Sequence, residues 1–506
     1  MTFLQNSATS LGGSKRKGFH IIHICTEMEP LISVGPLAPY ITGLSRALQK
    51  KGHLVEVILP KYASLDLDEV QGLREVVAES YSYFNGQLQG NKIWTGVVYG
   101  IGVTFIQPLY YSSFFNRDRI YDYSDDFERF SYFSRASLDY IAKSGKQPDV
   151  LHLHNWETAI VAPIFWDIFW DIFAKQRLGN TRILLTCQGF DSQCLVEPDK
   201  LALCGLDPGG LNHPDRLQDT AKTHLVNILK GGIVYSNKVI VMSSMHSKGG
   251  IIHNMSHELE PTLAFHQDKL LVAPYGFDNS AWDPATDILL PVKFSAENMR
   301  GKDACKVVLH QRAGISSLVS SVRVGCIISE VSDFDLEKLK EAVQNATSGG
   351  AQFVFLANAS LPTINRALRY LQEALEGPNV KFFTHYGEPL LRLVFAGSDI
   401  ILCHSLHDPL LQVPLKALRY GAAPVLEASG DNNFRYYADH DHEISRFLQF
   451  LRSTLGIMSL SQAIDEIRNN PSTWKTKISK AMKEDFSWDA ECYETHVSAY
   501  SAIKSL

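Results

Sequence analysis

Two histidines, His152 and His154, alternate along a predicted strand and therefore project from the same face. Paired imidazoles are common zinc ligands, but no carboxylate or cysteine is spaced to complete a site. The sequence therefore predicts no metal. Asp408 precedes a predicted helix, where a carboxylate can stabilise the helix N-terminus or act in catalysis. The stabilising role is favoured.

The eight cysteines are also candidates for chemistry. They lie far apart, with no Cys-x-x-Cys pair and no Cys/His metal spacing. This pattern is typical of buried thiols in a reducing compartment. The cysteines are Cys25, Cys187, Cys194, Cys204, Cys305, Cys326, Cys403 and Cys492.

Length and charge exclude several classes of protein. The chain has 506 residues, 45% of them hydrophobic, which is enough for two or three domains with real cores. Its 48 Lys and Arg against 54 Asp and Glu give a net charge of −6, which argues against nucleic acid as a partner. The longest apolar stretch, residues 161–173, carries two aspartates and is too short for a membrane span.

Predicted strands and helices alternate from residue 20 onward, which is typical of parallel sheets covered by helices on both faces. The first strand–helix–strand unit has strands at 20–25 and 54–59, with Ile41, Leu44 and Leu48 on one face of the helix between them. This unit opens a doubly wound α/β fold. Further buried strands are expected at 150–154, 183–187, 238–242, 270–273, 322–328, 352–356, 380–383, 400–403 and 423–426.

These two series of strands predict two doubly wound domains, joined near residues 305–320, with a ligand cleft between them. Residues 1–18 contain no acidic residue and a basic cluster at 15–17, so they are transit-peptide-like or disordered. The expected divisions are 1–18, an N-terminal domain at 19–310, a C-terminal domain at 316–480 and a terminal helix at 481–506.

Collinear motifs from about residue 20 to 501 resemble bacterial glycogen synthases and plant starch synthases. They lie at residues 27–53, 60–62, 124–130, 152–158, 227–239, 282–287, 301–302, 419–421 and 486–488. The run Ser-Asp-Asp-Phe-Glu-Arg-Phe at 124–130 is most similar to plant classes three to five. The chain is thus identified as a member of glycosyltransferase family 5.

The resemblance implies a GT-B fold, in which two Rossmann-like domains face each other and a C-terminal helix crosses back to the first domain. It also implies transfer of glucose from ADP-glucose to the non-reducing end of an α-1,4-glucan, with retention of configuration. Fold alone does not establish that activity. No cofactor is expected, and ADP-glucose would be the donor of an active enzyme.

The donor-binding positions implied by the family are altered. In the first loop, Ser33 replaces a lysine, while Gly35 and Pro36 stand where the family has two glycines. Proline has no N–H, so the loop loses a backbone group that could donate a hydrogen bond to phosphate. In the second domain, Ser329 and Phe334 align with an arginine and a lysine that neutralise the diphosphate. Charge-assisted hydrogen bonds are each worth about 1.5–3 kcal/mol. Because departure of the diphosphate needs this stabilisation, their loss should lower the rate of glucose transfer.

A third donor loop and the acceptor side give mixed indications. Asp408 matches a family glutamate, but Leu411 replaces a glycine. Asp125 matches an acidic residue of the family and, with His154 and Asp408, forms the catalytic remnants. Candidates for glucan binding are Asp125, His154, Asn155, Trp156 and Gln188. Aromatic residues Trp94, Tyr110, Tyr111 and Phe114 either line a sugar surface or, as favoured, pack in the ordinary way.

Several loops with one shared role are altered, whereas motifs without a role in chemistry persist. The leading hypothesis is a non-catalytic starch synthase-like protein, resembling plant class five, that assists granule initiation by binding α-glucan or initiation proteins. The alternatives are an active ADP-glucose glucosyltransferase built around Asp125, His154 and Asp408, and a transferase with another donor. We expect a plastid location, or a cytoplasmic one if the N-terminus is not a transit peptide.

Overall fold

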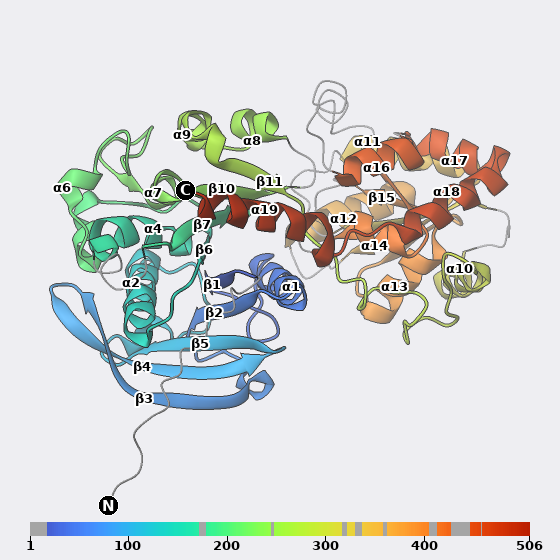
Figure 1. Ribbon diagram of the computed structural model, residues 1–506. Coiled ribbons are helices and arrows are strands. Elements are labelled where there is room, and N and C mark those ends of the chain that lie inside the picture. The colour runs from blue at the N-terminus through green and yellow to red at the C-terminus, as the bar shows by residue number, and fades with distance from the viewer. Residues whose placement is uncertain are drawn as a thin grey trace, which may run out of the picture.

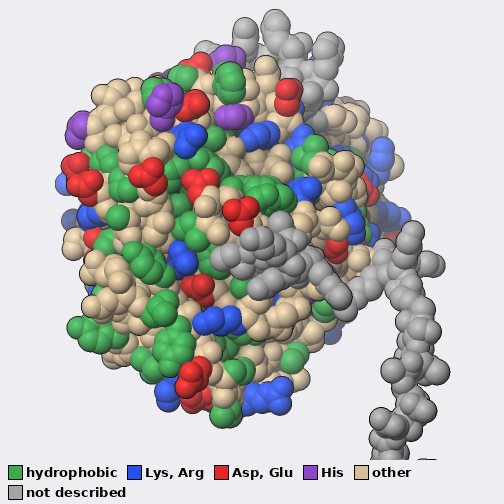
Figure 2. All heavy atoms as spheres, turned by 60° about the vertical axis from the view of Figure 1, so that its left-hand side comes forward, with side chains coloured by type: hydrophobic (Ala, Val, Ile, Leu, Met, Phe, Trp, Pro, Cys, Tyr) green, Lys and Arg blue, Asp and Glu red, His purple; other side chains and the backbone are tan. Residues whose placement is uncertain are grey.

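The computed structural model describes residues 18–171, 179–243, 247–315, 321–328, 336–357, 362–403, 412–426, 446–456 and 458–506. Two α/β domains lie side by side, each built on a sheet flanked by helices (Figure 1). The face in Figure 2 carries basic and acidic side chains interspersed. All eight cysteines are free thiols, and seven are buried, as expected from their spacing.

The first domain contains a nine-stranded sheet within the described residues. From one edge to the other, its strands are β11 (Leu270–Ala273), β10 (Lys238–Met242), β7 (Arg182–Cys187), β6 (Val150–His154), β1 (His20–Ile24), β2 (Leu54–Pro60), β5 (Ile101–Pro108), β4 (Gln87–Val98) and β3 (Gln71–Phe84). The strands from β11 to β5 pair in parallel. A separate ribbon pairs β8 (Leu195–Val196) with β9 (Val226–Asn227).

The longer helices of the first domain, such as α1 (Leu37–Lys50) and α2 (Asp126–Ser144), cover the sheet with an apolar face. The other described helices of this domain are α3 (Asn155–Ala159), α4 (Val161–Ile164), α6 (Pro208–Leu211), α7 (Ile228–Tyr235), α8 (Lys248–Asn254) and α9 (Glu260–Phe265). Ile41, Leu44 and Leu48 of α1 are fully buried, which confirms the predicted helix face.

The second domain has a five-stranded parallel sheet within its described part. In spatial order its strands are β14 (Val380–Phe383), β13 (Gln352–Ala357), β12 (Arg323–Ile328), β15 (Ile400–Cys403) and β16 (Ala423–Leu426). Its helices are α10 (Arg300–Ala313), α11 (Leu336–Ser348), α12 (Pro362–Leu375), α13 (Glu388–Gly397), α14 (Val413–Arg419), α16 (Arg446–Thr454), α17 (Leu460–Asn469) and α18 (Pro471–Lys483).

The domain boundary lies earlier than the expected 305–320. The first core ends at Tyr275 along this part of the chain, whereas Leu290, Phe294, Cys305 and Leu309 belong to the second core. Apolar residues are sparse between 282 and 306, so the sequence gives little sign of which core this segment joins. The few that are present pack into the second core together with α10, so the change of domain falls between Tyr275 and Leu290.

The chain returns to the first domain after α18, as the resemblance implied. Helix α19 (Tyr493–Lys504) runs from the second domain across to the first sheet (Figure 1). Trp488 anchors this return, since a Cβ on Gly43 or Gly276 would lie only 2.3–2.4 Å from its ring atoms. Ala499, Tyr500 and Ile503 then complete the first core.

The predicted parallel strands are confirmed, but the antiparallel ribbon of β3 and β4 was not predicted. Most of β3 is exposed on both faces, so its sequence lacks the continuous apolar run of a buried strand. Register shifts near its middle also interrupt the alternation of side chains that marks a half-buried strand.

Candidate functional site

The loop that joins β1 to α1 contains the predicted donor-binding residues Ser33, Gly35 and Pro36. The carboxylate of Glu27, only 2% exposed, accepts hydrogen bonds from the amides of Val34 at 2.5 Å and Gly35 at 3.0 Å. Pro36 precedes the first residue of α1 and has no N–H to donate. The amides at 34 and 35 are thus already engaged by a carboxylate of the same chain.

Acidic groups also lie beside Ser33, the position of the family's lysine. The Ser33 hydroxyl donates to Oε1 of Glu29 at 3.2 Å. Burial raises the pKa of Glu29, and the nearby carboxylates of Asp278 and Glu27 raise it further. This end of α1 therefore presents negative rather than positive charge to an incoming phosphate.

A cleft of about 1150 Å³ begins at this loop and lies between the two domains. Its walls come from α1, the crossing segments 275–282 and 485–489, and the start of α14. Among its described lining residues are three cations, Arg46, Lys50 and Lys416, and four acids, Glu29, Asp278, Asp485 and Asp489. Lys50 pairs with Asp489 at 2.5 Å, and the Arg46 guanidinium lies over the Tyr99 ring, so both cations serve internal contacts.

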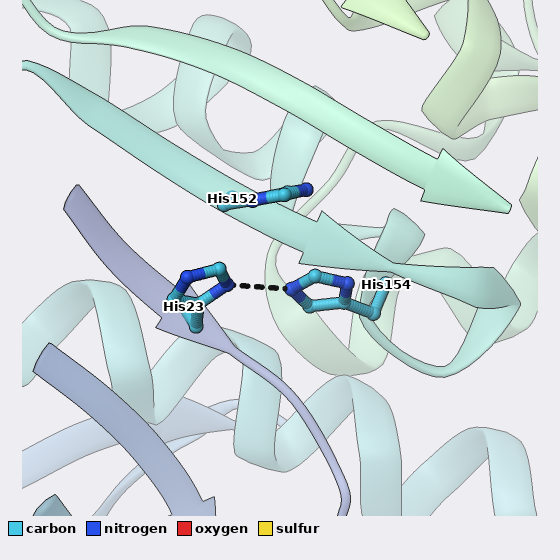
Figure 3. Close-up of side chains that lie close together, drawn as sticks. All are labelled: His23, His152 and His154. Atoms are coloured by element: carbon cyan, nitrogen blue, oxygen red, sulfur yellow. Dashed lines mark hydrogen bonds between the residues drawn. The ribbon is translucent and has the colours of Figure 1, made fainter. Parts of the chain in front are cut away.

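A cluster of histidines lies deeper in the first domain, on β1 and β6. His152 and His154 share a face of β6, as predicted, and His23 of β1 joins them (Figure 3). All three are buried, and Nδ1 of His23 lies 3.0 Å from Nε2 of His154. Burial lowers the pKa of each, to about 3 for His23, so all three are neutral near pH 7.

Hydrogen bonds extend from this cluster to α19 and α1. The ring nitrogens of His152 contact the hydroxyls of Tyr500 at 2.9 Å and Thr186 at 2.7 Å. Nδ1 of His496 lies 2.6 Å from the carbonyl oxygen of Cys492, which can only accept, so Nε2 accepts from Tyr40 at 2.7 Å. Burial lowers the pKa of His496 to about 4. The cluster therefore ties the returning helix to the first sheet.

Distance alone would let the cluster bind a metal ion, because one ligand atom from each of His23, His152 and His154 lies within 4.8 Å of the others. Hydrogen bonds oppose this. Both nitrogens of His152 are engaged, and the facing nitrogens of His23 and His154 bond to each other. The arrangement fits a neutral hydrogen-bonded core, and the expectation of no metal stays a prediction.

The acceptor-side candidates Asn155 and Gln188 bind each other across the ends of β6 and β7. The Asn155 amide donates to Oε1 of Gln188 at 3.2 Å, and the Gln188 backbone N–H donates to Oδ1 of Asn155 at 2.9 Å. Asn155 has a φ of +53°, which places its side chain in this position. Trp156 is only 9% exposed and packs edge-on against Phe130, so it belongs to the core rather than to a sugar surface.

Several buried polar atoms near these strand ends lack a hydrogen-bond partner among the described residues: His154 Nδ1, Tyr62 Oη and Glu157 Oε2. Burial raises the pKa of Glu157 to about 8, with Glu27 contributing, so this side chain holds a proton near pH 7. Buried polar atoms without partners call for a ligand or water. Sequence reasoning missed Tyr62 and Glu157 as site residues, although both lie within the motifs that carry the resemblance, Tyr62 two residues after β2 and Glu157 in the short helix α3 that follows β6.

Asp125 lies at the start of α2 and is held by Arg117. The two guanidinium nitrogens donate to its two oxygens at 2.6 and 2.5 Å. This ion pair lowers the pKa of Asp125. The carboxylate is therefore a bound anion with little capacity to accept a proton. The remaining predicted site residues, Ser329, Phe334, Asp408 and Leu411, lie outside the described residues.

Two Rossmann-like domains, a cleft between them and a helix that crosses back define the class of GT-B glycosyltransferases. The family described as the starch synthase catalytic domain matches residues 20–264. The chain belongs to the starch and glycogen synthase family, and the activity that characterises this family is glucose transfer from ADP-glucose to an α-glucan.

Individual relatives agree with this assignment. The chain is 36% identical over 500 residues to the probable starch synthase 4 of Arabidopsis thaliana, covering 96% of this chain and 48% of that protein. It is 32% identical to the glycogen synthase of Protochlamydia amoebophila, covering 96% and 99%. Its structure is similar to the Arabidopsis starch synthase IV catalytic domain bound to ADP and acarbose, with a TM-score of 0.78, 34% identity and coverage of 97% and 100%.

The chain thus spans about half the length of its Arabidopsis relative. None of the described helices combines the length and apolar character needed to cross a membrane.

Proposed function

We propose that this protein is a non-catalytic member of the family that binds α-glucan and acts in starch granule initiation. The observation that carries the proposal is the first donor loop, where Ser33 and the carboxylates of Glu27 and Glu29 stand where a phosphate would need cations. A bound diphosphate would lose the charge stabilisation on which its departure depends.

The rest of the cleft supports the same proposal. Four acids outnumber three cations along its described lining. In the second domain, the two positions that hold an arginine and a lysine in the family hold Ser329 and Phe334 here, so neither position supplies a cation.

Glucan binding is supported by the acceptor side. Tyr62, His154 and Glu157 hold a buried hydroxyl, imidazole nitrogen and protonated carboxyl that have no hydrogen-bond partner within the described part of the chain. Groups of this kind exchange hydrogen bonds with sugar hydroxyls, whereas a diphosphate needs cations. A plastid location and protein partners in granule initiation complete the proposal, and the chloroplast location in the name of the Arabidopsis relative favours the former.

An active ADP-glucose glucosyltransferase is the second candidate. Similarity to a bacterial glycogen synthase over 99% of that protein's length favours it, as does the likeness to a domain bound to ADP and acarbose. A transferase with a different nucleotide-sugar donor is the third.

Titration with ADP and ADP-glucose separates these candidates. A ligand of the native state at 100 times its Kd raises the free energy of unfolding by about 2.7 kcal/mol. We expect no resolvable thermal shift with either nucleotide and no transfer of radiolabelled glucose to maltoheptaose, whereas the protein is retained on amylopectin without nucleotide.

Saturable ADP-glucose binding with elongation of maltoheptaose would establish the active enzyme instead. Elongation with another nucleotide sugar alone would establish the third candidate. The catalytic domain of the Arabidopsis relative serves as the positive control in both assays. Failure to retain the protein on amylopectin, with no transfer, would leave protein binding as its role.

A further inference from the structure

A second surface, at the end of the β3–β4 ribbon away from the cleft, exposes four neighbouring apolar and aromatic side chains. We call it the outer ribbon face, and it consists of Tyr81, Leu88, Leu109 and Tyr110. Their exposed fractions are 42%, 72%, 53% and 77%. Hydrophobic side chains reach the surface over the lower left of Figure 2, at the level of the β3–β4 ribbon. Exposed apolar clusters of this kind mark binding surfaces.

Strand register makes these side chains one continuous surface. Tyr81 of β3 pairs with Gly90 of β4, and the Leu109 amide donates to the Gly90 carbonyl at 3.0 Å. A Cβ on Gly90 would lie 3.1 Å from Leu109 and 3.8 Å from Tyr81, so both side chains close over the glycine. Leu88 lies two residues along β4 and therefore on the same face.

The exposed ring of Tyr110 is held in place from behind. It packs edge-on against Tyr111, with centroids 5.1 Å apart. Tyr111 in turn stacks on Phe114, which is buried. Of the aromatic residues considered as a sugar surface from the sequence, Tyr110 is the one whose ring is mostly exposed. A ring fixed in this way loses little entropy on binding.

Charge narrows the choice of occupant. The four residues of the outer ribbon face are neutral. Lys143 beside them donates to the Tyr81 carbonyl at 3.1 Å and lies 5.5 Å from the Tyr81 ring centroid, and Lys92, on the same face of β4, pairs with Glu75 at 3.5 Å. A neutral surface with two exposed tyrosine rings suits a neutral ligand that has flat apolar faces and hydroxyl groups. Glucose units of an α-glucan have both.

A second copy of the chain is a poorer match. Pairing of β3 edges would bring together the charged residues Arg74, Glu75 and Glu79, and the register shift between Val76 and Ser80 disrupts the edge. We propose that the outer ribbon face is a second α-glucan-binding surface, which holds a long chain while the cleft contacts its end. This inference rests on the proposed glucan-binding function.

The test is electrophoresis of the purified full chain in native gels with and without amylopectin. The double variant Tyr81→Ala/Tyr110→Ala should weaken the apparent affinity for amylopectin about fivefold or more, because exposed aromatic anchors dominate such surfaces. Phe265→Ala, which removes an equally exposed aromatic ring (83%) elsewhere, should change nothing. Tyr110→Lys, which preserves the backbone and solubility, should repeat the loss.

Calorimetric titration with maltotriose, too short to reach both surfaces, should give the same cleft affinity in all variants. Unchanged amylopectin retention in both tyrosine variants would overturn the proposal while leaving the proposed function intact. A dimer in wild type that these variants convert to monomer would identify the face as an interface between copies and overturn it too. If the tyrosine variants lose amylopectin binding but no protein binds maltotriose, the outer ribbon face is supported as a glucan-binding surface. The cleft is then contradicted as a glucan site.

Discussion

The second domain keeps a buried cation that holds its fold together, whereas the donor loop has a serine where the family has a cation. Lys302 is only 5% exposed, and its ammonium donates to the backbone carbonyls of Ala396 at 2.9 Å, Ser398 at 2.8 Å and Tyr420 at 2.9 Å. At the donor loop the corresponding place for a cation holds Ser33, whose neighbour is the carboxylate of Glu29.

Arg392 repeats the pattern of Lys302. It contacts Asp287 at 3.1 Å, Glu388 at 2.5 Å and the Tyr420 hydroxyl at 3.1 Å, and it lies over the ring of Trp282. A cation that satisfies internal carbonyls and carboxylates is needed by the fold whatever the protein does. A cation that neutralises a diphosphate is needed only when the substrate is present. Likeness to a family therefore reports on the fold more directly than on activity.

The largest expected effect comes from removing the buried cation. Lys302→Met leaves the Ala396, Ser398 and Tyr420 carbonyls without their donor, which should lower the free energy of unfolding by about 3 kcal/mol or more. Urea unfolding followed by tryptophan fluorescence measures the change. Lys293→Met, at an exposed position, is the matched control and should cost less than about 0.5 kcal/mol. Equal stability of the two variants would contradict a structural role for Lys302.

Most of the fold could be predicted from the sequence because buried parallel strands have continuous apolar runs. β6, β10, β11, β14, β15 and β16 have the predicted bounds. The ribbon of β3 and β4 could not be predicted, since its exposed faces leave no such run. The domain boundary was misplaced because a few dispersed apolar residues, such as Leu290 and Phe294, decide which core a segment joins.

The candidate site was predictable only in part. Single positions such as Ser33 follow from the resemblance, and the shared face of His152 and His154 follows from the period of a strand. Partners are set by the fold. No sequence pattern indicates that Glu27 binds the amides of its own loop or that Arg117 binds Asp125. Likewise, nothing in the spacing places His23 and His496 in one network with β6.

The histidine network can be tested through the pH dependence of the free energy of unfolding. An unfolded histidine has a pKa of about 6.5, whereas burial lowers the pKa of His23 to about 3 and that of His496 to about 4. As the pH falls below 6.5, the unfolded state takes up protons that the folded state does not. Each of these histidines should then remove roughly 2 kcal/mol from the free energy of unfolding between pH 7 and pH 5.

Urea midpoints at pH 7, 6 and 5, at constant ionic strength, measure this loss. His496→Gln should make the pH dependence shallower by close to one proton, whatever its stability at pH 7. Its matched control is His224→Gln, at an exposed position outside the cluster. A stability that is flat from pH 7 to pH 5 would show that the cluster is not a neutral core.

The smallest expected effect is the one that bears most directly on the donor loop. If negative charge beside Ser33 repels phosphate, Glu29→Gln should tighten weak ADP binding, by about twofold to fivefold because the group is only half-buried. Broadening of the ADP phosphorus resonances measures the change, and Glu69→Gln, an exposed carboxylate elsewhere in the first domain, is the control. Tighter binding without any transfer of glucose would show that removing repulsion does not replace the missing cations. Weaker binding in Glu29→Gln would mean that Glu29 contacts the nucleotide, and the donor loop would then have to be regarded as a working site with altered chemistry.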